Sequence, residues 1–396
     1  MTKKTVRDVD VDGKRVLVRV DYNVPLDPDS GRVLDDNRIR STLPTVQYLR
    51  ERDAKVILAS HLGRPKGERV QSLGLWRVAE RLSDLLGAPV KTTGCCAGPI
   101  VQETAHSLEP GEVLLLENLR FHAEEEANDA EYAKALASLA EIYVNDAFAA
   151  AHRAHASTEG VARYLPAVAG LLMEKELEFL GRAVQDPERP YAAVIGGAKV
   201  SSKMAVLESL LERVDKLLIG GGMACTFLKA EGFNVGDSLV EDGYLEQARR
   251  VMERANEKGV TLLLPSDVII ADRFATDARA RRVSIKDVED GWRIMDVGDT
   301  TLDVFARALA DCKTVVWNGP LGVIEFPPFA HGSHRLASAI AGLKEATTIL
   351  GGGETAAVVE QLGIANRFSH VSTGGGASLE FLEGRELPGV AALMDR

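Results

Sequence analysis

The sequence lacks several features that would place it in a common class of protein. Its 396 residues include only four cysteines, none of them in a CxxC pair, so zinc knuckles and dithiol redox motifs are excluded. No uncharged apolar run is long enough to cross a membrane, and residues 1–12 are too polar for a signal peptide. Unpaired cysteines are typical of a reducing compartment. We therefore expect a soluble, cytoplasmic chain that has no membrane partner.

An excess of positive charge is also missing. The formal net charge is -11 and the pI is near 5.4, whereas nonspecific binding to nucleic acid requires lysine and arginine to neutralise phosphates. We therefore expect no nucleic-acid partner. Positive charge that holds an anionic ligand must then be gathered in one local cleft.

Short β-branched runs alternate with amphipathic segments along the chain, which is typical of parallel sheets covered by helices on both faces. The chain is also too long for one hydrophobic core. We predict an α/β fold with two doubly wound parallel-sheet (Rossmann-like) domains, residues 1–168 and 186–378, joined by a hinge helix at residues 169–185, with a ligand between the domains. The predicted strands are residues 15–20, 55–59, 113–116, 142–145, 192–195, 216–219, 261–264, 267–270, 314–317, 347–350 and 370–372, and the predicted helices include 43–52, 75–86, 129–140 and 171–183.

Basic, amide and carboxylate side chains follow four predicted strands of the first domain. The carboxyl ends of parallel strands meet at one edge of a sheet, so these side chains are expected to lie together. Because the planar fork of arginine binds carboxylates and phosphates bidentately, the pattern predicts an anion site. The alternative is that the arginines cap helices or pair with surface carboxylates. The residues that follow the strands are Asp21, Asn23, His61, Arg64, Arg120, His152, Arg153 and His155, and Arg38 stands at a predicted helix start.

Glycines follow the strands of the second domain. Gly196 and Gly197 precede Lys199 and Lys203, which are predicted to share a face at the start of a helix because they are four residues apart. Glycine lets backbone N–H groups approach an anion, and the helix dipole favours negative charge there, so a phosphorylated or nucleotide ligand is predicted. The GxxxxGK(S/T) spacing of a Walker A loop is absent. The further glycine runs are residues 220–222, 351–353 and 374–376.

Several strings of the sequence together resemble the phosphoglycerate kinase family, in that family's order and over nearly the whole chain. The resemblance implies a phosphotransferase with a carboxyl group as acceptor, acting reversibly between MgATP and 3-phosphoglycerate to give 1,3-bisphosphoglycerate and MgADP in glycolysis and gluconeogenesis. It also implies a monomer whose first domain holds phosphoglycerate and whose tail, residues 379–396, packs back on that domain. The strings are VRVDYNVP, SHLGRP, ENLRF, AHRAHAS, GGAKVSSK, WNGPLGVIEF, GGGETAA and STGGGASLEFLEG.

The same resemblance assigns site residues. The catalytic residues are expected to be Arg38, Lys199, Gly374 and Gly375. Those expected to bind phosphoglycerate are Asp21, Tyr22, Asn23, Arg38, His61, Leu62, Gly63, Arg64, Arg120, His152 and Arg153. Those expected to bind ATP or ADP are Lys199, Lys203, Gly220, Gly221, Asn318, Glu325, Gly352, Gly353, Glu354 and Thr355.

One position departs from the family pattern. Most relatives carry Asp in the turn where this chain has Glu354, and that carboxylate serves the metal. Mg²⁺ needs only one or two protein carboxylates beside phosphates and waters, so we expect Glu354 to be the metal residue, with a shifted metal position or affinity.

Two other functions fit an α/β chain of this kind. A dinucleotide-dependent dehydrogenase would carry GxGxxG directly after its first strand, but DYNVP stands there instead. A non-catalytic phosphometabolite-binding protein would have no need of Lys199 and Lys203 in their own glycine turn. Both alternatives are therefore disfavoured.

Overall fold

The computed structural model describes residues 3–396, which form two compact units. Unit 1 contains residues 3–178 and 386–396, and unit 2 contains residues 179–385. The division falls inside helix α6 (Leu171–Gln185). Among the described residues, no helix combines the length and the apolar character that a membrane crossing demands.

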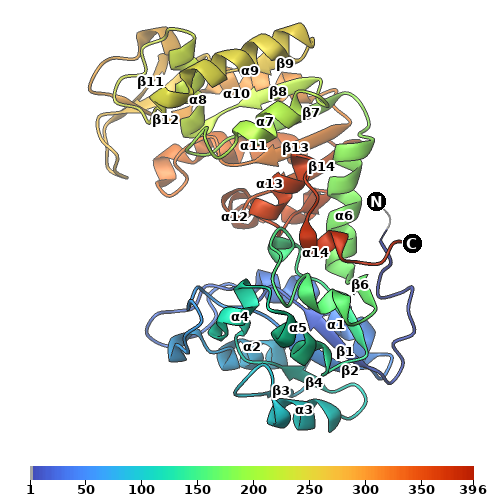
Figure 1. Ribbon diagram of the computed structural model, residues 1–396. Helices are drawn as coiled ribbons and strands as arrows, with labels where there is room; N and C mark the ends of the chain where they lie inside the picture. The colour runs from blue at the N-terminus through green and yellow to red at the C-terminus, as the bar shows by residue number, and fades with distance from the viewer. Residues whose placement is uncertain (1–2) are drawn as a thin grey trace. The chain divides into compact units, whose positions relative to one another are not determined.

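Unit 1 is built on a six-stranded parallel sheet in the order β3-β4-β2-β1-β5-β6, with helices packed around it (Figure 1). All of its strands except the edge strand β3 are almost wholly buried, which explains their continuous apolar sequence. The strands are β1 (Arg15–Arg19), β2 (Lys55–Ala59), β3 (Val90–Thr92), β4 (Val113–Leu115), β5 (Ile142–Asn145) and β6 (Ala167–Ala169). The helices are α1 (Asn37–Arg50), α2 (Trp76–Leu86), α3 (Pro99–His106), α4 (Ala123–Glu126), α5 (Ala130–Ala137) and α14 (Pro388–Ala391), with 3-10 turns η1 (Gln71–Leu73), η2 (Leu119–Phe121), η3 (Phe148–Ala150) and η4 (Gly160–Arg163).

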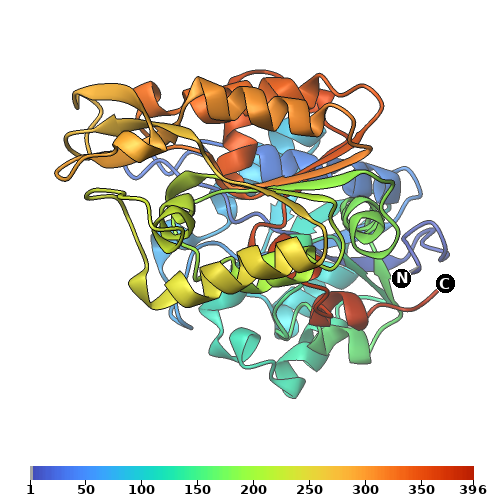
Figure 2. The ribbon, with the colours of Figure 1, turned by 90° about the horizontal axis from the view of Figure 1, so that it is seen from above.

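Unit 2 has a second six-stranded parallel sheet, in the order β15-β14-β13-β7-β8-β9. Seen from above, its strands run between α9 on one side and α10 and α11 on the other (Figure 2). The strands are β7 (Tyr191–Ile195), β8 (Lys216–Ile219), β9 (Thr261–Leu263), β13 (Thr314–Asn318), β14 (Thr347–Gly351) and β15 (His370–Val371). The helices are α7 (Met204–Leu210), α8 (Gly221–Ala230), α9 (Leu245–Glu257), α10 (Asp299–Leu309), α11 (His331–Ala341), α12 (Gly353–Gln361) and α13 (Gly376–Leu382).

The prediction of two parallel-sheet α/β domains is confirmed, with one correction. The predicted strand at residues 267–270 exists as β10 (Asp267–Ala271), but it does not extend the parallel sheet. It pairs antiparallel with β11 (Ala280–Ser284) and β12 (Arg293–Val297) in a separate small sheet. Apolar content alone could not distinguish these two kinds of strand partner.

The C-terminal residues divide between the units at a different point from the expected 379. Residues 379–382 continue α13, and Ser209 Oγ donates to the carbonyl of Glu383 at 3.0 Å, so this stretch belongs to unit 2. Residues 386–396 belong to unit 1, where Asn145 Nδ2 donates to Gly389 O at 3.0 Å. There the backbone N–H of Met394 also donates to the carbonyl of Ala167 at 3.0 Å.

Candidate functional site

In unit 1, four neighbouring strands place their following residues at one edge of the sheet. β4, β2, β1 and β5 are adjacent and parallel, so their carboxyl ends point the same way. The segments that follow carry Arg120, His61, Asp21 and Arg153 respectively. The sheet therefore brings together the basic groups that are far apart in the sequence.

Asp21 is the centre of the polar contacts at this edge. Its carboxylate is buried and forms an ion pair with the half-buried Arg38 at the start of α1. Its second oxygen lies 3.7 Å from His61 Nδ1. Asp21 Oδ1 also accepts from the backbone N–H of Asn23 at 3.2 Å, which shapes the loop after β1.

Arg19, which the sequence reading missed, determines the state of His61. Arg19 is buried, and its Nη2 lies 3.1 Å from His61 Nδ1. A guanidinium can only donate, so Nδ1 accepts and the ring proton resides on Nε2. Burial, and then the positive charges of Arg19 and Arg120, hold the pKa of His61 well below its ordinary value. His61 is therefore a neutral hydrogen-bond donor.

Asn23, Gly63 and Arg120 link three of the strand ends. The N–H of Gly63 donates to Asn23 Oδ1 at 2.9 Å, and Arg120 Nη1 donates to the carbonyl of Gly63 at 2.8 Å. Gly63 has φ of +65°, and a Cβ there would lie 2.9 Å from Leu73. Only glycine fits this link without strain. Arg120 Nε also lies 3.3 Å from Glu126 Oε1.

The remaining basic residues differ in their exposure. Arg153 is half-buried, and its Nε donates to Nε2 of the neighbouring His152 at 3.1 Å. Arg64 is exposed and forms no hydrogen bond or ion pair with any residue from 3 to 396. Arg64 therefore has its full hydrogen-bonding capacity free for a ligand.

Two residues expected to contact phosphoglycerate do not offer side chains to it. Tyr22 is fully buried, and its hydroxyl lies 3.0 Å from Thr42 Oγ1. Leu62 is buried in the core of unit 1, and the side chain of Asn118 bonds both its N–H and its carbonyl. Both residues support the loops that carry the polar side chains.

A buried network behind this edge was also missed. Glu125 is wholly buried and accepts from Ser157 Oγ at 2.5 Å, while Arg19 Nε donates to the same hydroxyl at 2.8 Å. Burial raises the pKa of Glu125, and the charge of Arg19 opposes that rise. Burial, followed by the charge of Arg19, lowers the pKa of His155 to about 4. A run of three glutamates at 124–126 gave no signal that the middle one is buried.

In unit 2, glycine-rich turns follow five neighbouring parallel strands: β15, β14, β13, β7 and β8. The turns after β7, β13 and β14 line a cavity of about 490 Å³. Glycines and two lysines are among its lining residues, a combination that suits phosphate groups. The lining residues are Gly196, Gly197, Ala198, Lys199, Ser202, Lys203, Asn318, Gly319, Gly352, Gly353, Glu354 and Thr355.

The two lysines of this cavity do not share a helix face as predicted. Residues 201–203 form a turn and α7 begins only at Met204, so Lys203 is the N-cap and Lys199 precedes the helix. Lys199 is exposed, whereas Lys203 is largely buried and donates to Asn318 Oδ1. Burial lowers the pKa of Lys203 to about 8, against the attraction of Glu354 and Glu383.

The turn after β14 forms the N-terminus of α12. Gly352 has φ of +93°, a conformation that residues with a Cβ rarely adopt. Thr355 is buried, and its hydroxyl accepts from the N–H of Gly319 at 2.8 Å, so the turns after β13 and β14 are held together. Glu354 is exposed in the first turn of α12, with its carboxylate on the cavity wall.

The turn after β15 is built in a similar way. The N–H of Gly374 donates to Ser372 Oγ at 3.1 Å, and that hydroxyl lies 2.6 Å from Ser378 Oγ. Gly375 has φ of +53° and is the N-cap of α13. Both glycines therefore form a tight strand-to-helix connection.

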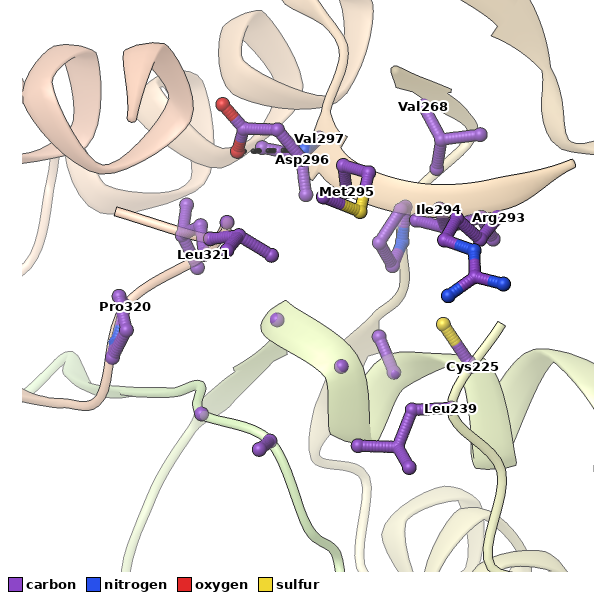
Figure 3. A pocket seen from close by; sticks show the side chains of 18 of the residues that line it. Cys225, Leu239, Val268, Arg293, Ile294, Met295, Asp296, Val297, Pro320 and Leu321 are labelled. Carbon is purple, nitrogen blue, oxygen red and sulfur yellow. Dashed lines mark hydrogen bonds between the residues drawn. The ribbon is translucent and has the colours of Figure 1, made fainter. Parts of the chain in front are cut away.

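A second cavity, of about 250 Å³, shares Gly197 and Glu354 with the first. Side chains from α8, β12 and the turn after β13 enclose it, including Cys225, Met295 and Leu321 (Figure 3). Its largely apolar wall suits the flat ring of a base. Glu325 is an exposed carboxylate on this wall.

Of Gly220 and Gly221, which were both expected to bind ATP or ADP, only Gly221 lines the second cavity. Gly220 packs instead against Leu321, where a Cβ would lie 2.4 Å from a methyl carbon. Gly220 thus allows close packing rather than offering a surface to a ligand.

Asp296 on the cavity wall was not expected from the sequence. It is buried and accepts from the N–H of Gly332 at 2.8 Å. It also accepts from the N–H of Val297 at 2.9 Å (Figure 3). Burial raises the pKa of Asp296 to about 7. These backbone bonds give the carboxylate a structural role in joining β12 to the start of α11.

The residues of the larger cavity fit a magnesium ion carried by phosphates. Among residues 3–396, His, Cys, Asp and Glu form no cluster of three or more that would hold a metal ion by themselves. Glu354 supplies one exposed carboxylate beside the two lysines. Mg²⁺ commonly takes one protein carboxylate with phosphate oxygens and waters, so a single carboxylate is sufficient here.

Comparisons with known proteins identify the family of the chain. The sequence profile described as phosphoglycerate kinase matches residues 6–385. A phosphoglycerate kinase of Synechococcus elongatus is 59% identical over 401 residues, covering all of both chains, and one of Moorella thermoacetica is 55% identical over 396 residues, again covering all of both chains. The solved phosphoglycerate kinase of Coxiella burnetii superposes with a TM-score of 0.88 at 43% identity, and that of Pyrococcus horikoshii with 0.86 at 34% identity, each covering 98% of both chains. The chain belongs to the phosphoglycerate kinase family.

Proposed function

We propose that this chain transfers a phosphoryl group reversibly between MgATP and the carboxylate of 3-phosphoglycerate, giving 1,3-bisphosphoglycerate and MgADP. The observation that carries the proposal is the cavity of unit 2 in which Lys199, Lys203 and Glu354 face a wall of strand-end glycines. Such a wall binds polyphosphate, and the basic strand ends of unit 1 bind a second, smaller anion.

Phosphoglycerate is assigned to unit 1. Arg38, Arg64, Arg120 and Arg153 supply positive charge, and guanidinium groups bind phosphate and carboxylate oxygens bidentately. His61 adds a neutral Nε2–H donor. The amide of Asn23 is fixed by Gly63, so its free N–H group has a set direction toward a hydroxyl or carboxylate.

ATP and ADP are assigned to unit 2. The apolar cavity beside Gly221 receives the base, Glu325 accepts from a ribose hydroxyl, and Gly352, Gly353 and Thr355 meet the phosphates. Lys199 and Lys203 neutralise the phosphoryl group in transfer. Gly375 presents its backbone N–H to that group, while Gly374, whose N–H is bonded to Ser372, shapes the turn. A bound Mg²⁺ ion would add a bridge between phosphate oxygens, with Glu354 as its protein ligand.

The proposed reaction needs no general base. The attacking group is a carboxylate, which is already ionised at neutral pH. Catalysis then rests on positioning the two anions and on neutralising charge on the moving phosphoryl group. That requirement agrees with a site rich in Arg, Lys and Gly.

The test is an assay on the purified chain with 3-phosphoglycerate and MgATP that follows acyl-phosphate formation, with a control that lacks phosphoglycerate. Formation of acyl phosphate that depends on both substrates supports the proposal. Tight binding of both ligands without turnover would instead indicate a non-catalytic binding protein.

Three further expectations remain proposals. These are the cytoplasmic location, the monomeric state and the hinge role of residues 169–185. Sedimentation measures the assembly state directly. Solution scattering tests the hinge: the radius of gyration should fall when phosphoglycerate and a nonhydrolysable MgATP analogue are both bound, and an unchanged value would contradict it.

A further inference from the structure

Three of the four thiols are protected from reaction. Cys96, Cys225 and Cys312 are buried. Burial raises the pKa of the Cys96 thiol well above its ordinary value, that of Cys225 to about 12 and that of Cys312 to about 11. Because the thiolate is the reactive form, these three groups are inert near neutral pH.

Cys95 has a different environment, although it is the direct neighbour of Cys96. It is only partly buried, and its Sγ lies 3.5 Å from Nε2 of His122. The imidazole of His122 stacks on the ring of Tyr132, with centroids 5.0 Å apart. An imidazole held at this distance is a base for the thiol, which is the arrangement of activated cysteine nucleophiles.

A second polar group faces the two sulfurs. The hydroxyl of Tyr132 is buried and interacts with the Cys96 thiol. Burial, and then the Cys96 thiol, raises the pKa of Tyr132, so the hydroxyl keeps its proton. The hydroxyl therefore serves Cys96, whereas the ring of Tyr132 supports His122.

The loop that carries Cys95 is fixed by contacts of its own. Thr93 Oγ1 donates to the carbonyl of Cys95 at 2.7 Å, and Arg69 Nη1 donates to the carbonyl of Gly94 at 3.0 Å. Cys96 Sγ donates to the carbonyl of Glu117 at 2.9 Å, which turns that thiol away from solvent. The loop therefore leaves Cys95 partly exposed and buries Cys96.

We propose that Cys95 is a modification site that exchanges with low-molecular-weight disulfides, with His122 as its proton acceptor. The Cys95 thiol gives its proton to His122 Nε2, and the thiolate attacks one sulfur of the reagent RSSR. A bond forms between Cys95 Sγ and that sulfur as the S–S bond of the reagent breaks. The departing thiolate takes the proton from His122 and leaves as RSH, so one disulfide replaces another.

Cys96 does not resolve the adduct. Resolution would require a Cys96 thiolate to attack the mixed disulfide, but Cys96 is buried and its proton is engaged by the Glu117 carbonyl. The adduct on Cys95 therefore persists until an external thiol removes it.

The test treats the reduced full-length chain with glutathione disulfide near neutral pH and locates the adduct by peptide mass mapping. We expect one adduct, on Cys95, formed at least about fivefold faster than on the same thiol in the urea-unfolded chain, where His122 no longer lies beside it. Cys95→Ser should abolish the adduct, and Cys96→Ser should keep it. First modification at another cysteine, or equal rates in the folded and unfolded chains, would overturn the proposal.

Two histidine variants distinguish proton transfer to His122 from simple solvent exposure of Cys95 as the cause of fast adduct formation. His122→Gln should slow formation of the Cys95 adduct by about fivefold or more, whereas His106→Gln, at an exposed position in α3, should leave the rate unchanged. Equal rates in all three proteins would overturn the role of His122. The comparison of folded and unfolded wild-type chain decides the question even if His122→Gln fails to fold.

Discussion

Both units are built on six parallel strands, in different orders, and they present different groups at the strand ends. In unit 1 the strand ends carry Arg, His and Asp side chains, several of them buried and bonded to each other. In unit 2 the strand ends carry glycines, and the backbone supplies the donors. One architecture therefore supports two recognition chemistries through the residues that follow its strands.

The difference implies that the two sites are sensitive to different kinds of substitution. A site made of side chains loses function when one side chain is truncated. A site made of backbone N–H groups loses function when a Cβ is added and the turn cannot keep its conformation. Truncation should therefore affect unit 1 most strongly and additions should affect the glycine turns of unit 2.

The largest effect is expected at Arg38. Arg38→Ala removes a charged donor and leaves buried Asp21 without its ion pair, so kcat/KM for phosphoglycerate should fall by about a thousandfold. Steady-state kinetics with varied phosphoglycerate measure this change. Arg40→Ala is the matched control, because Arg40 lies on the same helix, is exposed and pairs with Asp36. Nucleotide affinity should be unchanged in both variants, and unimpaired use of phosphoglycerate by Arg38→Ala would contradict the assignment.

Lys199 tests the side-chain part of the unit 2 site. Lys199→Ala should lower kcat about a hundredfold while nucleotide affinity changes far less, because the lysine acts mainly in the transition state. Nucleotide titration and single-turnover rates separate the two quantities. Lys229→Ala, at an exposed lysine of α8 paired with Asp242, should behave as wild type. A normal kcat with only a raised KM for ATP would assign Lys199 a different role.

Much of the difference between the two sets of strand ends could be predicted from the sequence, because it depends on which residues follow each strand along the chain. Parallel strands and their turns follow from apolar runs and the glycines or charges behind them, which explains why Asp21, His61 and Arg120 were found. Arg19 and Glu125 were not found, since burial of a charged residue depends on tertiary contacts that no local pattern records. The start of α7 was placed too early, because the spacing of Lys199 and Lys203 fits a turn as well as a helix.

Gly352 tests the backbone part of the unit 2 site. Gly352→Ala forces a Cβ onto a residue with φ of +93°, so the free energy of unfolding should fall by about 1–2 kcal/mol, with a loss of nucleotide affinity. Gly353→Ala is the control, since nothing lies within 4 Å of its Cβ position and alanine favours a helix. Urea unfolding and nucleotide titration measure both effects. Equal stability of the two variants would contradict a conformational requirement at Gly352.

The lowered pKa of Lys203 predicts how nucleotide binding depends on pH. In the free protein the positive charge is complete well below pH 8 and is lost as the pH rises through about 8. Affinity for ADP should therefore decrease roughly three- to tenfold between about pH 7 and about pH 9. Calorimetry across this range measures the change. The Lys203→Arg variant keeps its positive charge over this whole pH range. If its ADP affinity fell with pH as steeply as that of the wild type, the assignment of the pH dependence to Lys203 would be contradicted.

The smallest effect is expected at Glu354. Its carboxylate faces a cavity suited to phosphates, where a bare negative charge would be repelled unless a cation bridges the two. Glu354→Gln should therefore raise the Mg²⁺ concentration for half-maximal rate by about three- to tenfold, and Glu354→Asp should remain active. Magnesium titrations of the initial rate measure this shift.

The alternative role of Glu354 is electrostatic and independent of metal. An acidic residue in the first turn of α12 interacts with the helix dipole, which is worth about 0.3–1 kcal/mol. Under that alternative, Glu354→Gln would lower the melting temperature slightly, and all three proteins would share one magnesium dependence. A changed magnesium dependence of the rate in Glu354→Gln, together with a nearly unchanged melting temperature, would assign the carboxylate to the metal. Loss of a contact with the helix dipole does not by itself alter the affinity for the ion.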